Sequence, residues 1–357
     1  MTIETTPSTY SSANDPLVWV VYDAYSVDTA KLNFKYIAEV WINSVLRFTS
    51  KSYPNPINNR GIFELDSIIR NYLVSTFTAE QGAGQFSQSV EVKLGYEYLV
   101  GSTITTAMPS TSTLVVFNHY GGRTPNFTDL ATYVNKPATN RPTTIYLKAG
   151  ATTYYLPYFA TTTTAFNVVI NGTTTTITPT AINTMQRINI AAGLSTDYTV
   201  VIAGTTYQVK VICAGMYTNY ILHFLNKWGG FDSMLFNKVS RKKYAAEKKS
   251  YQQMPYRVSS AGVVSIKTGD VMHTQKSVFG MQFSEQLKVS TDWLSDAEYQ
   301  WLAQLVTSPI VYLEDSGTLY PITIGDTNYE FKTNIVDSLA NLSLDIDFGT
   351  KYNTQYL

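Results

Sequence analysis

The sequence has little charge, and this scarcity narrows the function classes that it fits. Only 15% of its 357 residues are charged, and 26 basic residues balance 26 acidic ones. A general nucleic-acid binder needs an excess of cations to displace counterions from the phosphate backbone. We therefore expect no general nucleic-acid contact, and we look for function in other features of the chain.

Cysteine and histidine are also scarce. The lone cysteine, Cys213, excludes an intrachain disulfide framework and a cysteine-rich zinc site. It ends the apolar run 209–213, so we expect a small buried side chain. The histidines His119, His223 and His273 lie far apart, and none has the spacing of a metal motif. We predict no metal, no cofactor and, for His223, a solvated or hydrogen-bonded position on a strand.

Long apolar runs and a leader pattern are absent as well. Residues 1–15 are polar, with no cationic start and no apolar stretch. No apolar run approaches the roughly 20 residues that a membrane-spanning helix needs. We expect a protein without a signal peptide or membrane span, made in a cytoplasm and either soluble or assembled there.

What the sequence has in abundance is aromatic and β-branched residues. It contains 27 tyrosines, and 44% of its residues are hydrophobic. A neutral, aromatic surface is poorly protected against association, and aromatic residues are enriched at protein interfaces. We expect other subunits to cover much of this surface. The alternative is an aromatic-rich β core.

The first part of the chain predicts a flexible arm followed by a β-sandwich. Residues 1–14 are the arm, and 15–142 alternate apolar and polar residues as half-buried strands do. The stretch 63–74 has a helical apolar stripe, with Asp66 as a candidate N-cap. The fold class that we predict for the whole chain is mainly β, with several immunoglobulin- or fibronectin-like β-sandwich modules and two short helices.

A Thr-rich β module is expected over 143–215. Charge nearly disappears there, and Asn171-Gly172 separates two strand-like runs, a strong signal for a type I′ hairpin. Ala203-Gly204 separates two further runs in the same way. The module is either an insertion or a second sandwich.

Residues 216–357 predict a C-terminal β domain with a capped helix at about 295–307. Ser295 and Glu298 have the spacing of a capping box, and Ser308-Pro309 ends the helix. Two closing hairpins follow, the second of which pairs 329–332 with 339–348.

The most informative segment is a hairpin between two strand-like runs, 220–225 and 233–237. Its turn carries Trp228, Gly229, Gly230 and Phe231, so two aromatic side chains flank two adjacent glycines. We interpret these four residues as a packing anchor, either between domains or between subunits, because desolvated aromatic residues often dominate interfaces. The alternative is an ordinary corner of the core.

A basic tract follows this hairpin. It extends from Lys238 to Lys249 around a single Glu247 and includes Arg241, Lys242, Lys243, Lys248 and Lys249. The tract could contact nucleic acid in a channel or an acidic partner. We favour a protein contact or a solvated edge strand, whose lysines deter edge-to-edge pairing.

No pattern of catalytic residues stands out, so we predict that the chain is not an enzyme. A G-x-S-x-G elbow and a phosphate-binding loop are both absent from the sequence. Paired carboxylates are the remaining candidates, because polysaccharide-cleaving β proteins often use two of them. The candidate pairs are Glu314 with Asp315, Asp345 with Asp347, and Glu64 with Asp66.

With these residues in view, the chain resembles virion structural proteins of tailed phages that infect Bacteroidetes, including crAss-like phages. Short blocks in a common order carry the resemblance, and 143–215 lies outside it. The blocks are Phe34-Lys-Tyr36, Pro54-Asn-Pro56, Arg60-Gly-Ile-Phe63 and Asn71-Tyr-Leu73; 224–232 with Phe236-Asn237 and Lys249-Ser-Tyr251; 292–298 with Ser308-Pro309, Leu313-Glu-Asp315 and Tyr320-Pro321; and 341–348.

The resemblance implies a β-rich tail component, such as a hub, baseplate or tail-tip protein, that works in a ring of copies in the virion. Its expected partners are copies of itself and other tail proteins, and it would be made in the host cytoplasm. A receptor- or glycan-binding protein at the virion surface is the alternative. A polysaccharide-cleaving enzyme is the third class. The resemblance implies no catalytic residue.

Overall fold

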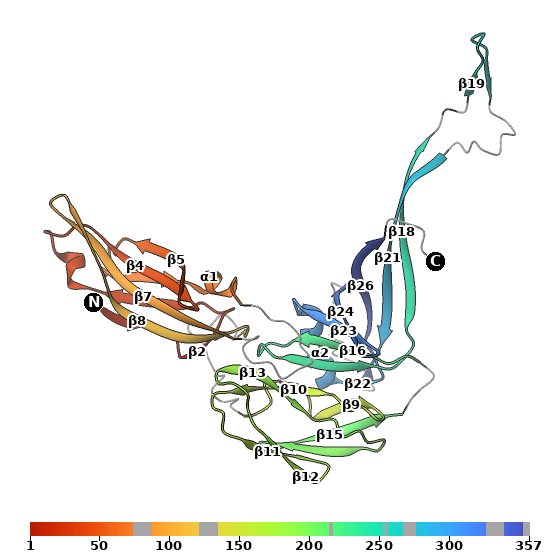
Figure 1. Ribbon diagram of the computed structural model, residues 1–357, viewed down its shortest axis with the longest axis horizontal. Helices are drawn as coiled ribbons and strands as arrows, with labels where there is room; N and C mark the ends of the chain where they lie inside the picture. Colours follow the sequence, from red (N-terminus) through yellow and green to blue (C-terminus); the bar gives the residue numbers. More distant parts are fainter. Residues whose placement is uncertain are drawn as a thin grey trace.

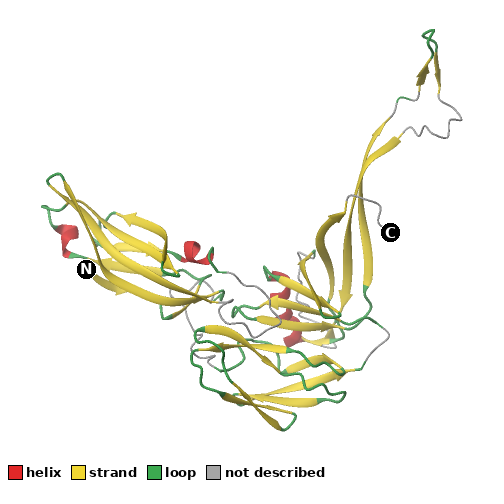
Figure 2. Ribbon diagram, in the orientation of Figure 1, coloured by secondary structure: helices red, strands yellow, loops and turns green. Residues whose placement is uncertain are grey.

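The computed structural model describes residues 1–73, 87–120, 135–213, 217–252, 254, 256–266, 276–325 and 339–352. The protein is mainly β, as predicted, with its strands in several sheets and two α-helices in these described ranges (Figure 2). An N-terminal domain and a long β arm extend in different directions from a middle part, which a Thr-rich module and a larger sheet form (Figure 1).

The N-terminal domain is a β-sandwich. A three-stranded sheet, β1-β3-β6, faces a five-stranded sheet, β2-β8-β7-β4-β5, across a core that includes Trp19, Tyr36 and Val92. The elements are β1 Thr2–Thr5, β2 Tyr10–Ser12, β3 Val18–Tyr22, η1 Ala24–Val27, β4 Leu32–Ile42, β5 Val45–Ser52, β6 Gly61–Glu64, α1 Asp66–Arg70, β7 Ser87–Val100 and β8 Thr103–Phe117.

The flexible arm predicted for residues 1–14 is wrong. β1 pairs with β3, β2 pairs in parallel with β8, and the terminal amino group of Met1 lies 2.7 Å from a carboxylate oxygen of Asp23. The polar side chains of this segment have partners inside the domain. Ser12 donates a hydrogen bond to the carbonyl of His119, and Asn14 Nδ2 donates to Asn118 Oδ1 at 2.8 Å. Satisfied polar groups allow a polar segment to be buried.

The first helix is shorter than expected, and Asp66 does not cap it. Phe63 belongs to β6, where it pairs with Trp19, so α1 begins only at Asp66. Leu65 occupies the N-cap position and makes no side-chain cap bond. Pairing in the sheet thus overrides the helical periodicity in the first turn that we predicted.

The Thr-rich module is a small β unit with its own core. A five-stranded sheet, β12-β11-β14-β15-β9, covers a two-stranded sheet, β10-β13. The strands are β9 Thr144–Lys148, β10 Tyr155–Ala160, β11 Phe166–Ile170, β12 Thr173–Ile177, β13 Thr184–Asn189, β14 Tyr198–Ile202 and β15 Thr205–Ile212.

Both predicted hairpins of this module are confirmed. Asn171 and Gly172 have φ of 48° and 77°, and Ala203 and Gly204 have φ of 50° and 82°. Positive φ at both central residues is what a type I′ turn requires. The prediction of a buried Cys213 is wrong: the side chain is exposed, because β15 ends one residue earlier, at Ile212.

The C-terminal domain is built on a seven-stranded sheet of order β17-β16-β23-β24-β26-β21-β18, and α2 contributes Trp301, Leu302 and Leu305 to its core. The elements are β16 Tyr220–Leu225, β17 Phe231–Phe236, β18 Arg241–Gln252, β19 Tyr256–Val258, β20 Val264–Ile266, β21 Lys276–Ser290, β22 Leu294–Ser295, α2 Asp296–Thr307, β23 Val311–Asp315, β24 Thr318–Ile324, β25 Leu339–Ala340 and β26 Ser343–Tyr352.

The capping box of α2 is confirmed. The hydroxyl of Ser295 accepts a bond from the backbone N–H of Glu298, whose carboxylate accepts one from the backbone of Ser295 at 2.8 Å. The predicted strand 329–332 lies outside the described residues.

The arm is a continuation of β18 and β21 beyond the seven-stranded sheet. The two strands pair from Arg241 with Lys288 to Gln252 with Lys276, whereas β26 pairs only with the stretch of β21 from Phe283 to Ser290. The outer half of the arm is therefore a two-stranded ribbon. A small hairpin, β19 with β20, lies at its far end (Figure 1).

Candidate functional site

The three domains meet in one apolar cluster that contains the predicted anchor residues. β8, β10, β13 and the β16–β17 hairpin all contribute to it. Trp228 is 4% exposed and Phe231 is 2% exposed, so both are buried within a single chain. The members of this junction core are Val115, Phe117, Ala138, Phe159, Met185, Leu225, Trp228 and Phe231.

The β16–β17 turn is held by Asn226, which is itself buried. Its Oδ1 accepts bonds from the backbone N–H groups of Trp228 at 2.9 Å and Gly230 at 3.1 Å. Its Nδ2 donates to the carbonyl of Ala138 at 2.9 Å, which ties the turn to the segment that enters the Thr-rich module.

The two glycines allow the domains to approach closely. Gly229 has φ of 82°, and a Cβ there would lie 3.0 Å from the carbonyl oxygen of Asn118 in the N-terminal domain. A Cβ on Gly230 would lie 2.4 Å from the Cβ of Pro157 in the Thr-rich module. Each glycine therefore faces a different neighbouring domain, which the sequence signal of a tight turn did not indicate.

His119 extends the junction core on the side of the N-terminal domain. Its ring stacks on Trp228 with centroids 4.7 Å apart and planes 9° from parallel. Burial is the main cause that lowers the pKa of His119 from 6.5 to about 4; the charge of Asp15 opposes the drop, and the charge of Lys227 adds to it. The imidazole is therefore neutral at physiological pH.

Two buried charged residues, Asp232 and Arg141, lie behind the turn, and the sequence analysis missed them. They interact through their opposite charges without a direct ion pair, and we call them the buried pair. Asp232 Oδ2 accepts bonds from Thr139 Oγ1 at 2.7 Å and from Trp301 Nε1 at 3.0 Å. Arg141 stacks over the Trp301 ring at 4.8 Å and donates through Nη1 to the Tyr154 hydroxyl at 2.9 Å.

The buried pair connects three parts of the chain: the linker (residues 135–143, which lead into β9), the Thr-rich module and the C-terminal domain. Burial raises the pKa of Asp232, and the positive charge of Arg141 opposes that rise. The sequence signal was a carboxylate inside the strand-like run 231–236, which is apolar except for Asp232 and Ser233. Nothing in the sequence pairs that carboxylate with an arginine far away in the chain.

His223 is hydrogen-bonded on both sides, as one of our two interpretations held. Its Nδ1 lies 2.7 Å from Ser233 Oγ, and its Nε2 lies 2.9 Å from Glu314 Oε2. Burial lowers the pKa of His223, and the bond from the imidazole lowers the pKa of Glu314.

This Ser–His–Glu group does not present a nucleophile. A neighbouring cavity of about 190 Å³ is lined by His223 and Glu314, together with Thr153, Tyr154, Tyr155, Ile221, Gly317 and Leu319. Ser233 is 3% exposed and lies on the other side of the imidazole. A substrate in the cavity would meet the carboxylate, whereas nucleophilic catalysis requires it to meet the hydroxyl.

The three candidate carboxylate pairs lie on different parts of the fold. Glu64 and Asp66 belong to the N-terminal domain, and β24 separates β23 from β26. Asp345 lies 3.4 Å from Lys243 Nζ, and Asp347 accepts a bond from the backbone N–H of Gly349 at 2.8 Å. These contacts are typical of strand surfaces and turns.

The basic tract lies on β18, the edge strand of the seven-stranded sheet, with exposed side chains. Lys242 pairs with Glu285 at 3.2 Å, and Lys238 pairs with Asp292 at 2.8 Å. Arg241, Lys248 and Lys249 have no ion-pair partner within the described ranges. The position agrees with our interpretation of a solvated edge.

Within the described part of the chain, no three metal-ligating side chains gather at one point. Among the described helices, none is long and apolar enough to cross a membrane.

Comparisons with known proteins assign no family. No family model and no curated protein matches the chain. Among solved structures, extracellular domains 3–5 of Drosophila OTK are similar at 10% identity and a TM-score of 0.23, over 89% of this chain and 94% of that one. A TM-score this low carries no conclusion about fold or function.

The buried imidazole predicts acid sensitivity of the junction core. The pKa of His119 is about 4 in the folded protein and 6.5 as its ordinary value, so the unfolded chain binds a proton first as pH falls. Stability from this group is complete above pH 6.5 and is lost toward pH 4. The free energy of unfolding of the wild type should fall between pH 7 and 4.5. We expect this fall to be about 2–3 kcal/mol smaller in His119→Phe, which keeps a stacked ring but cannot bind the proton. Urea unfolding at both pH values measures this. Equal losses in both proteins would contradict the assignment.

The close approach at Gly230 predicts that a methyl group there is not tolerated. We expect Gly230→Ala to lower the free energy of unfolding by about 1–3 kcal/mol, because the new Cβ overlaps Pro157. Gly280→Ala is the matched control, since its nearest contact would be an ordinary 3.7 Å to Lys249. Denaturant unfolding compares the two variants. A control that is as unstable as Gly230→Ala would show that the close approach is not the cause.

The buried pair predicts a large effect of removing one charge. We expect Asp232→Asn to destabilise the protein by about 1–3 kcal/mol, because it weakens two buried hydrogen bonds to a charged group and removes the negative charge that offsets Arg141. Asp197→Asn is the control, because it breaks a solvent-exposed pair with Lys210 and should change stability little. Thermal unfolding of both variants tests this. Similar unfolding temperatures would argue against a structural role of the buried pair.

Proposed function

We propose that this protein is a non-enzymatic structural component of a bacteriophage tail, of the hub, baseplate or tail-tip type, which assembles into a ring with copies of itself and other tail proteins. The assignment to a phage tail rests on the sequence blocks described above. The assembly role is supported by where the chain leaves apolar side chains uncovered.

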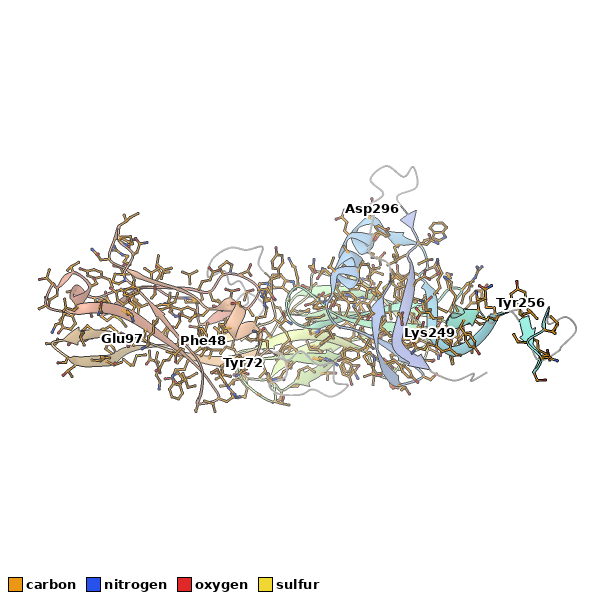
Figure 3. The ribbon with its side chains drawn as sticks, turned by 90° about the horizontal axis from the view of Figure 1, so that it is seen from above. Phe48, Tyr72, Glu97, Lys249, Tyr256 and Asp296 are labelled. Carbon is orange, nitrogen blue, oxygen red and sulfur yellow. The ribbon has the colours of Figure 1, made fainter. Side chains whose placement is uncertain are left out.

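Uncovered apolar side chains lie both in the N-terminal domain and on the arm, on opposite sides of the middle part (Figure 1), and this observation carries the proposal. The edge strand β5 of the N-terminal domain exposes Val45, Leu46 and Phe48, and the arm exposes Tyr251 and Phe279. Phe48 and Tyr72 lie in the N-terminal domain, whereas Lys249 and Tyr256 lie toward the opposite end (Figure 3). Large apolar side chains that remain exposed together mark interaction surfaces.

Two different surfaces on opposite sides of the middle part favour a head-to-tail contact. When surface A of one copy binds surface B of the next, the copies form a ring if the rotation closes. The outer arm also requires packing from another chain, because an isolated two-stranded ribbon is marginally stable in water. A neighbouring copy alongside it would supply the missing packing.

The oligomeric state tests this proposal. We expect mass photometry of the purified chain to show a multiple of 39.8 kDa. The double variant Val45→Asp/Phe48→Asp should shift the distribution to the monomer, because it places two charges in the proposed contact. Trp293→Asp is the control, since this exposed side chain belongs to the C-terminal domain and follows the inner end of β21, the end opposite Phe279.

A wild type that stays monomeric and is absent from mature phage particles would overturn the proposal. A monomer that binds a glycan array, with binding lost when exposed tyrosines are replaced, would favour the alternative of a receptor- or glycan-binding protein at the virion surface.

A further inference from the structure

The hairpin at the end of the arm has one face that is apolar and uncovered. Tyr256 precedes Val258 by two residues on β19, and Val258 pairs with Val264 on β20. Because side chains alternate along a strand, these three share one face. They are 52%, 64% and 61% exposed. Val263 in the connecting turn and Met254, which precedes β19 by two residues, are exposed as well.

The turn of this hairpin is well formed, so the apolar face is held in place. Ser259 N–H donates to the carbonyl of Val263 at 2.9 Å, and Gly262 N–H donates to the carbonyl of Ser259 at 2.9 Å. The Ser259 hydroxyl also accepts a bond from the backbone of Val263 at 3.1 Å. Arg257, paired with Ser265, lies on the face opposite Val258.

Aromatic and cationic side chains lie together on the arm behind the tip, where Lys276 pairs with Gln252 outside Tyr251 and Lys249 pairs with Gly280 next to Phe279. Tyr251 and Phe279 lie with ring centroids 6.1 Å apart on the two strands of the arm, and both are exposed. Lys248 and Lys249 come next toward the body, and Figure 3 shows Lys249 between the body and Tyr256. In the described outer arm, Glu247 is the acidic residue among these cations.

We infer that the end of the arm is a membrane-contact element for an anionic lipid surface. Apolar side chains at the tip would enter the boundary between headgroups and acyl chains. The amphipathic ring of Tyr256 would lie at headgroup level, where tyrosine is enriched. The cations of the outer arm would face the negative surface potential of anionic lipids.

The size of the tip favours a lipid surface over a second copy of the chain. Stable protein interfaces bury about 1,200 Å² or more in total, from some 20–30 residues on each side. A hairpin with three residues in each strand is too small to supply such a side. Binding to a membrane does not require an interface of this area, because a few inserted apolar side chains and nearby basic residues together supply the affinity. The projection of the arm would bring the tip to a bilayer ahead of the body (Figure 1).

Vesicle flotation with the full-length chain tests this inference. The probes are vesicles of phosphatidylglycerol and phosphatidylcholine in equal amounts, and vesicles of phosphatidylcholine alone. We expect binding to the anionic vesicles, weakened by added salt, and at least about tenfold weaker binding to the neutral ones. Val258→Asp/Val264→Asp should lower binding to the anionic vesicles by a similar factor, because it places two charges on the inserted face.

The matched control is Ile57→Asp/Ile104→Asp, which charges two exposed side chains of the N-terminal domain and should leave vesicle binding unchanged. Circular dichroism and mass photometry without vesicles are used to check that the tip variant keeps its fold and its oligomeric mass. Absence of vesicle binding by the wild type would overturn the inference, as would full binding by the tip variant. A tip variant that loses its oligomeric mass while the wild type ignores vesicles would assign the tip to self-contact and also overturn it. Mass photometry of the β5 variant tests the proposed assembly separately.

Discussion

The architecture depends on a carboxylate that is removed from water where the linker, the Thr-rich module and the C-terminal domain meet. Asp232 is fully buried, accepts bonds from Thr139 and Trp301, and lies in the field of the buried Arg141. A buried charge is tolerated only where partners compensate for the lost hydration. These domains must therefore keep one relative position, because separating them would leave both charges without compensation.

The junction core adds a nonpolar constraint to this polar one. Trp228 and Phe231 fill the space between domains, Gly229 and Gly230 let the backbones approach, and His119 stacks on Trp228 from the N-terminal domain. Close packing makes such contacts intolerant of added volume. The result is a frame from which β5 and the arm present their uncovered side chains at fixed positions.

The placement of the few charged side chains is consistent with this arrangement of domains. Lysines on the edge strand β18 are partly neutralised by Glu285 and Asp345 of the same domain, whereas Lys248 and Lys249 lie farther out on the arm. Charged side chains thus line an edge strand, where they deter random edge-to-edge pairing. Aromatic and aliphatic side chains are left exposed where we propose that neighbours and a lipid surface make contact.

Local patterns determined the strands, the two hairpins at Asn171-Gly172 and Ala203-Gly204, and the capping box at Ser295, because each depends on residues a few positions apart. Tertiary structure alone decided that Trp228 and Phe231 are buried between domains of one chain, that residues 1–14 pair into sheets, and that Arg141 accompanies Asp232. It also decided that Cys213 lies outside the core. Those outcomes depend on long-range contacts between segments, and neither alternation nor composition encodes the partner of a distant residue.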